Sequence, residues 1–232
     1  MNTGTADPYV MLVASLPALG PMLGSHRPAI SAERLQERLG YLDPADRADL
    51  EAMRASLSWS RLDLGESDAH FLGRVDALVA RLRSPVLRAA VRDRLEIRTL
   101  VAALRRRAMG QEAPPAGERW GYGRFVAVIR ANWAQPDFGV ARTFPWMTKA
   151  RERLEAGDAA GLERVVLQAA WNAAARHADG HIFDFEAVAL YVMRWSMVDR
   201  WSRYDVASAT ARFSALLDAA TVDAAAAIGT HP

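Results

Sequence analysis

The longest stretch without a helix-breaking residue lies at residues 183–201, which read F-D-F-E-A-V-A-L-Y-V-M-R-W-S-M-V-D-R-W. It contains neither proline nor glycine, so we expect one helix of about five turns. From residue 187 to 193 the only polar group is the Tyr191 hydroxyl, which predicts a helix covered on more than one side. Charged residues interrupt both ends, whereas a membrane span needs about 20 largely uncharged residues. The pattern predicts the core helix of a soluble protein.

Helical periodicity and start signals also recur through the first half of the chain. Asp43-Pro44 and Ser84-Pro85 each pair an N-cap residue with proline at the first helical position. Ser31 is a further N-cap, and Gly110 is a stop signal. We predict helices at residues 31–39, 43–57, 67–82 and 84–109. The apolar run at residues 9–16 is read instead as a buried strand or short hydrophobic segment.

The second half holds six of the seven tryptophans and is again helical in pattern. The predicted helices there lie at residues 120–133, 146–154, 162–173, 183–201 and 207–219. Residues 111–117 contain Pro114-Pro115 and little that is apolar, which is typical of a linker. We therefore predict a mainly α multi-helix bundle with a short N-terminal extended segment. It would have two helical halves, residues 1–110 and 118–232, joined by the linker at 111–117.

Composition excludes several classes of function. The chain has no cysteine, which rules out disulfides, thiol nucleophiles, Fe–S clusters and cysteine-based zinc sites. Its formal net charge is only +2, and Lys149 is the only lysine among 29 basic residues. The basic groups are not interleaved with aromatic residues in the manner of a nucleic-acid surface, so no nucleic acid partner is expected. No secretion signal is recognised at the start, which favours the cytoplasm.

No motif for catalysis is present. The sequence has no phosphate-cradling glycine loop, no G-x-S-x-G and no H-E-x-x-H. The acidic pairs Asp93/Glu96 and Asp43/Asp46 lie beside no nucleophile, so we expect surface residues or helix caps. The chain is therefore expected to be non-enzymatic and to hold no cofactor. The tryptophans are read first as core, with a soluble helical regulator that binds a ligand among them as an alternative.

His177 and His181 are the one candidate for a metal site. They are four residues apart and Asp184 follows closely, and two histidines at this spacing on a continuous helix can share a metal ion. Gly180, however, predicts that the helix ends between them. The alternative is a pair of histidines interacting with the C-terminal end of a helix. A small metal-dependent enzyme using His177, His181 and Asp184 is kept as the competing function.

Several phrases, in this order, resemble an uncharacterised bacterial family whose genes accompany those of a V-type (V/A-type) ATPase. They are Y-V-M-L-V-A-S-L-P-A-L, E-I-R-T-L-V-A-A-L-R-R-R, N-W-A-Q-P-D-F-G, F-P-W, L-E-R-V-V-L-Q-A-A-W and the residue 183–201 stretch. The resemblance covers residues 9 to about 217. It implies a role at the place of the ATPase C subunit (d in eukaryotes), an all-helical part that couples the central stalk to the membrane ring. This chain looks shorter than that subunit and has no evident threefold repeat.

This resemblance implies a non-catalytic accessory or coupling subunit of an ion- or proton-transporting complex. Its partners would be the central stalk and membrane ring subunits. The protein would be cytoplasmic and peripheral to the membrane through the complex, with no direct membrane insertion. The expected contact residues are the basic triplet Arg105, Arg106 and Arg107, and the aromatic pair Phe144 and Trp146. The triplet has a second interpretation as solvated cations at a helix C-terminus, favoured there by about 0.3–1 kcal/mol each.

Overall fold

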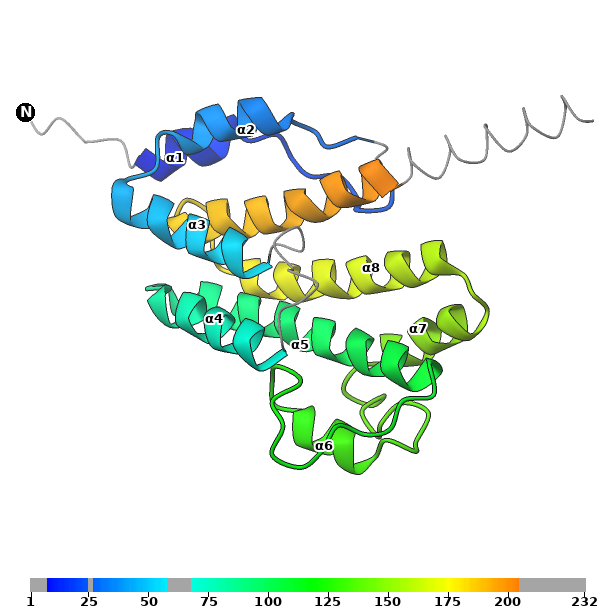
Figure 1. Cartoon of the computed structure of the whole chain (residues 1–232). Coiled ribbons are helices and arrows are strands. Elements are labelled where there is room, and N and C mark those ends of the chain that lie inside the picture. The colour runs from blue at the N-terminus through cyan, green and yellow to red at the C-terminus, as the bar shows by residue number, and fades with distance from the viewer. Residues whose placement is uncertain (1–7, 25–26, 58–67, 205–232) are drawn as a thin grey trace, which may run out of the picture.

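The computed structural model describes residues 8–24, 27–57 and 68–204, and all regular structure in these ranges is helical (Figure 1). The mainly α class predicted from the sequence is confirmed. The elements are α1 (Pro8–Ser15), α2 (Ala32–Leu39), α3 (Pro44–Leu57), α4 (Asp68–Arg81), α5 (Pro85–Ala108), α6 (Val126–Ala131), α7 (Trp146–Glu155), α8 (Ala159–Ala178) and a helix over residues 185–204. Among these helices none is both long and apolar enough to cross a membrane. The helix predicted at residues 207–219 lies outside the described residues.

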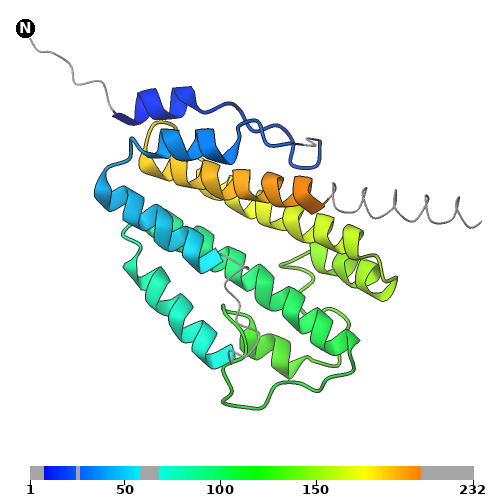
Figure 2. The same cartoon turned by 45° about the horizontal axis from the view of Figure 1, so that its top comes forward.

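The helices stack in layers around helix 185–204 and α8. Both views place helix 185–204 between α1 and α2 on one side and α8 on the other (Figures 1 and 2). On the other side of α8 lies α5, which also packs against α3, α4, α6 and α7. The helix α5 belongs to the first expected half, and α7 and α8 belong to the second. Since α5 packs against both, the buried residues of the two expected halves form one hydrophobic core in the described part of the chain. The use of residues 111–117 as a domain boundary remains a prediction.

Helix 185–204 is buried as its composition predicts. Two polar side-chain groups of this helix donate hydrogen bonds to the N-terminal segment. The Tyr191 hydroxyl donates to the Pro17 carbonyl and the Trp195 indole to the Ile30 carbonyl, both at 2.9 Å. Backbone carbonyls more than 150 residues away in the sequence therefore satisfy these donors. The buried apolar residues of this helix are Phe185, Val188, Ala189, Leu190, Val192, Met193, Trp195, Met197, Val198 and Trp201.

The predicted helix starts are confirmed by their capping hydrogen bonds. Ser31 Oγ accepts from the amide of residue 34 at 3.3 Å, and Ser84 Oγ from that of residue 87 at 3.2 Å. Asp43 Oδ1 accepts from two amides of the first turn of α3. These caps satisfy donors that the helix itself leaves unpaired. Asp46, grouped with Asp43 as a surface residue or cap, instead forms an ion pair at 2.6 Å with Arg83, which lies in the connection between α4 and α5.

Two predicted elements are wrong. The expected extended segment at residues 9–16 forms α1, in which Leu12 is buried while Met11 is 70% exposed. A short apolar run has no periodicity that separates a strand from a helix, which explains the error. The helix expected at residues 120–133 is reduced to α6. Residues 120–125 leave the helical path because Gly123 has a φ of 108°, in the region that favours glycine.

Candidate functional site

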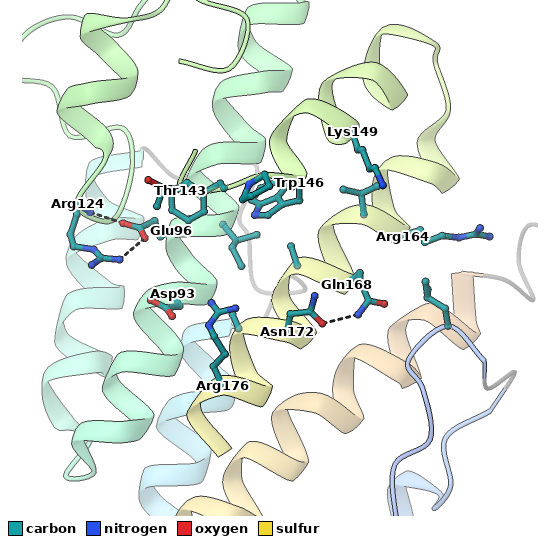
Figure 3. A pocket seen from close by; sticks show the side chains of 17 residues that line it. Asp93, Glu96, Arg124, Thr143, Trp146, Lys149, Arg164, Gln168, Asn172 and Arg176 are labelled. Carbon is teal, nitrogen blue, oxygen red and sulfur yellow. Dashed lines mark hydrogen bonds and ion pairs between the residues drawn. The ribbon is translucent and has the colours of Figure 1, made fainter. Parts of the chain in front are cut away.

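A cavity of about 710 Å³ opens between α5, α7 and α8 (Figure 3). This volume lies in the range of roughly 300–1,000 Å³ that is usual for sites that hold a ligand or a few side chains of a partner. Its apolar lining comprises Leu23, Ile97, Phe144, Pro145, Trp146, Val165, Ala169 and Ala173. Its polar lining comprises Asp93, Glu96, Arg124, Thr143, Lys149, Arg164, Gln168, Asn172 and Arg176. The cavity therefore combines an apolar floor with a charged rim, mostly basic.

The aromatic wall of the cavity is built at the start of α7. Phe144 and Trp146 are half-buried, and their ring centroids lie 6.3 Å apart at a steep angle. Phe125 also packs edge-to-face with Phe144, with centroids 5.1 Å apart and an interplanar angle of 81°. Edge-to-face contacts of this kind fix ring orientation. Phe144 and Trp146, the two aromatic residues expected to contact a partner, thus lie together on the cavity wall, and Phe125 packs against Phe144.

Glu96 holds one side of the cavity together. Its carboxylate accepts from the Arg124 amide at 2.8 Å and from Arg124 Nη2 at 3.3 Å. The Glu96 side chain is only 6% exposed, whereas that of Arg124 is 76% exposed. The expectation that Glu96 is a surface residue or cap is therefore wrong. A buried carboxylate needs such partners because desolvation of an unpaired charge is costly.

Thr99, one helical turn after Glu96, fastens the same loop. Its hydroxyl donates to the Leu95 carbonyl at 3.2 Å and accepts from the Tyr122 amide at 2.8 Å. A Cβ on Gly121 would lie 2.5 Å from Thr99 Cγ2, so only glycine allows the loop to lie this close to α5. Residues three apart share a helix face. The signal that sequence reasoning missed is a Glu and a Thr at that spacing, complementary to a G-Y-G-R loop.

Two cations on the rim of the cavity have no charged partner among the described residues. Lys149 and Arg176 are exposed, and neither forms a hydrogen bond or ion pair with any other residue in the described ranges. Nearby, Gln168 Nε2 donates to Asn172 Oδ1 at 2.9 Å along α8 (Figure 3). Asp93, a rim carboxylate, is occupied by His177 at 2.9 Å. The rim therefore presents unpaired positive charge beside the aromatic wall.

The structure separates the two histidines expected to share a metal. His177 Nε2 pairs with Asp93 across the α5–α8 interface, while His181 Nδ1 lies 2.6 Å from Asp184 Oδ2. His181, Asp184 and Glu186 bring potential ligand atoms within 4.8 Å of one another, so His177 is replaced by Glu186 in the candidate group. Asp184 also has a structural role, because its Oδ1 accepts from the Ala187 amide at 2.8 Å and so caps helix 185–204.

We expect Asp184→Ala to lower the free energy of unfolding by about 0.5–2 kcal/mol, the usual cost of losing an N-cap. Urea denaturation followed by circular dichroism measures this loss. Elemental analysis of the purified protein is the companion measurement, for which the capping role predicts no stoichiometric metal. A bound metal that is lost on changing His181 to Ala would contradict this account and favour the metal-dependent enzyme.

The basic triplet at the end of α5 is divided among different roles. Arg106 forms an ion pair with Asp68 of α4 and lies over the Trp120 ring at 5.8 Å. Arg107 donates to the Gln135 carbonyl and lies over a second aromatic ring. Only Arg105 is exposed. Arg106 and Arg107 thus fix the C-terminal end of α5 to α4 and to the turn at Gln135. Cations at a helix C-terminus are also favoured by the helix dipole.

Comparison with known proteins identified no relative. A scan against protein-family models, a search of curated proteins and a search of solved structures each returned no match.

Proposed function

We propose that this chain is a non-catalytic helical subunit of a V-type ATPase, at the place of the C (d) subunit, where it links central stalk and membrane ring through protein–protein contacts. The cavity between α5, α7 and α8 is its partner-binding surface. The occupant would be a segment with acidic and apolar side chains, since the cavity offers an apolar floor beside free cations on its rim.

One observation carries the proposal: separate phrases of the resemblance line this one cavity. E-I-R-T-L supplies Glu96 and Ile97, and F-P-W supplies the residue 144–146 wall. L-E-R-V-V-L-Q-A-A-W supplies the residues facing them from α8, which are Arg164, Val165, Gln168 and Ala169. Because these phrases are far apart in the sequence, their meeting at a single surface supports a common role there.

The construction of the cavity also suits a coupling part. Its walls lie on long helices, and the loop that completes it is fastened to α5 through Glu96 and Thr99. Sites supported by packed helices keep their geometry better than sites on free loops. A subunit that transmits rotation or holds two other subunits together needs this kind of rigid surface, and it needs no reactive group.

The proposal is tested by affinity purification of the tagged full-length protein from its native host, with mass spectrometry of the proteins that co-purify. We expect stalk and ring subunits of the ATPase in fixed proportion to the tagged chain. Recovery of the tagged chain alone, under conditions that keep the ATPase intact, would contradict the proposal.

A further inference from the structure

A second, smaller cavity lies between α5, α8 and helix 185–204, apart from the one described above. Its volume is about 30 Å³. It is lined by Arg94, Arg98, Val101, Arg105, Glu163, Val166 and Arg200. Among the described residues, four guanidinium groups and one carboxylate line this small space, which gives it an excess of positive charge.

The guanidinium group of Arg94 is deeply buried. Its Nη1 atom is buried and has no hydrogen-bond partner, and no ion pair joins Arg94 to another residue in the described part of the chain. Burial lowers the pKa of Arg94 to about 10, and repulsion from Arg200 contributes further to the shift, against the attraction of Glu163. The side chain is still protonated at neutral pH. A buried cation with an unsatisfied donor is costly unless an anion joins it.

The neighbouring residues do not supply that anion. Glu163, the one lining carboxylate in the described ranges, accepts from Arg200 Nε at 2.5 Å and its side chain is 14% exposed. Arg98 lies over the Phe71 ring at 4.2 Å and is attracted by Asp68, a carboxylate that is not part of the cavity lining. Arg105 is exposed and gives the cavity an edge that faces solvent. A dissolved anion can therefore reach Arg94 from that side.

We propose that this cavity binds a small oxyanion such as phosphate or sulfate, with Arg94 Nη1 as its buried donor. Guanidinium groups are suited to this role because they present several N–H donors in a planar fork. The volume limits the ligand, since about 10–15 Å³ already accommodates one water-sized probe. At about 30 Å³ the cavity can thus hold two or three oxygens of one tetrahedral anion, with the remainder at the solvent-facing edge beside Arg105, but not a nucleotide. The inference is independent of the function proposed for the larger cavity.

The test is thermal unfolding of the full-length protein in increasing phosphate, with chloride exchanged to keep the ionic strength constant. A ligand that binds only the folded state raises the midpoint in a saturable manner, by about 5 °C or more at a hundredfold excess over its Kd. We expect this rise for the wild type and for Arg92→Met, an exposed position on the same helix. Arg94→Met should show no rise, while its midpoint without phosphate equals or exceeds that of the wild type, because a buried charge has been removed.

Three results would overturn the proposal. They are an equal phosphate response in Arg94→Met, a wild-type response that chloride reproduces, and no saturable response of the wild type. Glu163→Gln gives a second test that does not depend on how Arg94→Met folds. It removes the carboxylate that the described residues contribute to the lining, so phosphate should bind more tightly, and unchanged or weaker binding would also count against the site.

Discussion

Gly123→Ala is expected to destabilise the protein by about 2–4 kcal/mol. Two independent effects contribute. The φ of Gly123 is 108°, which an alanine rarely adopts, and the added Cβ would lie 2.7 Å from Glu96 Oε1 and 3.1 Å from Glu96 Cβ. The carboxylate cannot simply move aside, because it is buried and accepts from the Arg124 amide. Either the loop leaves α5 or Glu96 loses its partner.

Urea denaturation measures this loss, and Gly73→Ala is its matched control. Gly73 lies within α4 and is exposed, and a Cβ there would meet nothing within 4 Å. The same glycine-to-alanine change should stabilise α4 by about 0.5–1 kcal/mol, since alanine loses less entropy in a helix. Similar changes in stability for the two variants would show that the residue 121–124 loop is not held as described.

Lys149→Glu combined with Arg176→Glu is expected to reduce recovery of ATPase subunits with the tagged chain by about tenfold or more, equivalent to about 1.4 kcal/mol of binding free energy. Both side chains are exposed on the cavity rim, so reversal of their charge would repel the acidic segment proposed to bind there. Neither forms an ion pair within the described chain, so folding should be preserved.

The control for this variant is Arg34→Glu combined with Arg81→Glu, which changes the net charge equally at exposed positions on α2 and α4. It should co-purify the same subunits as the wild type. Equal losses in both double variants would mean that total charge matters rather than the cavity. Arg105→Glu is a useful third variant, because it tests the exposed member of the basic triplet without breaking the contacts of Arg106 and Arg107.

The parts of the fold that could be predicted depend on signals local in sequence. Each of these signals belongs to a single helix. They are the N-caps at Ser31, Asp43 and Ser84 and the unbroken apolar run of residues 183–201. Such patterns depend on propensity and periodicity, which act within a few residues. That is why α2, α3, α5 and helix 185–204 occur where they were expected.

The features of the fold and site that could not be predicted depend on contacts between segments far apart in the sequence. In the sequence, nothing distinguishes Glu96 from other glutamates of a helix. Its burial and its hydrogen bonds to Arg124 depend on the G-Y-G-R loop, which lies more than 20 residues later. In the same way His177 pairs with Asp93 rather than with His181, because α8 lies against α5. The aromatic wall was expected to contact a partner, but its place opposite α8 follows from tertiary packing alone.

Lysine-specific cross-linking of the protein in complex with the ATPase tests the central claim most directly. Lys149 is the only lysine of the chain, so side-chain links formed by an amine-reactive reagent report from the rim of the cavity alone. The control is Lys149→Arg combined with Arg34→Lys, which moves that single lysine to exposed α2. The account predicts links from Lys149 to stalk or ring subunits, reduced or lost in the control. Association with the ATPase that yields links only from position 34 would contradict the cavity as the binding surface.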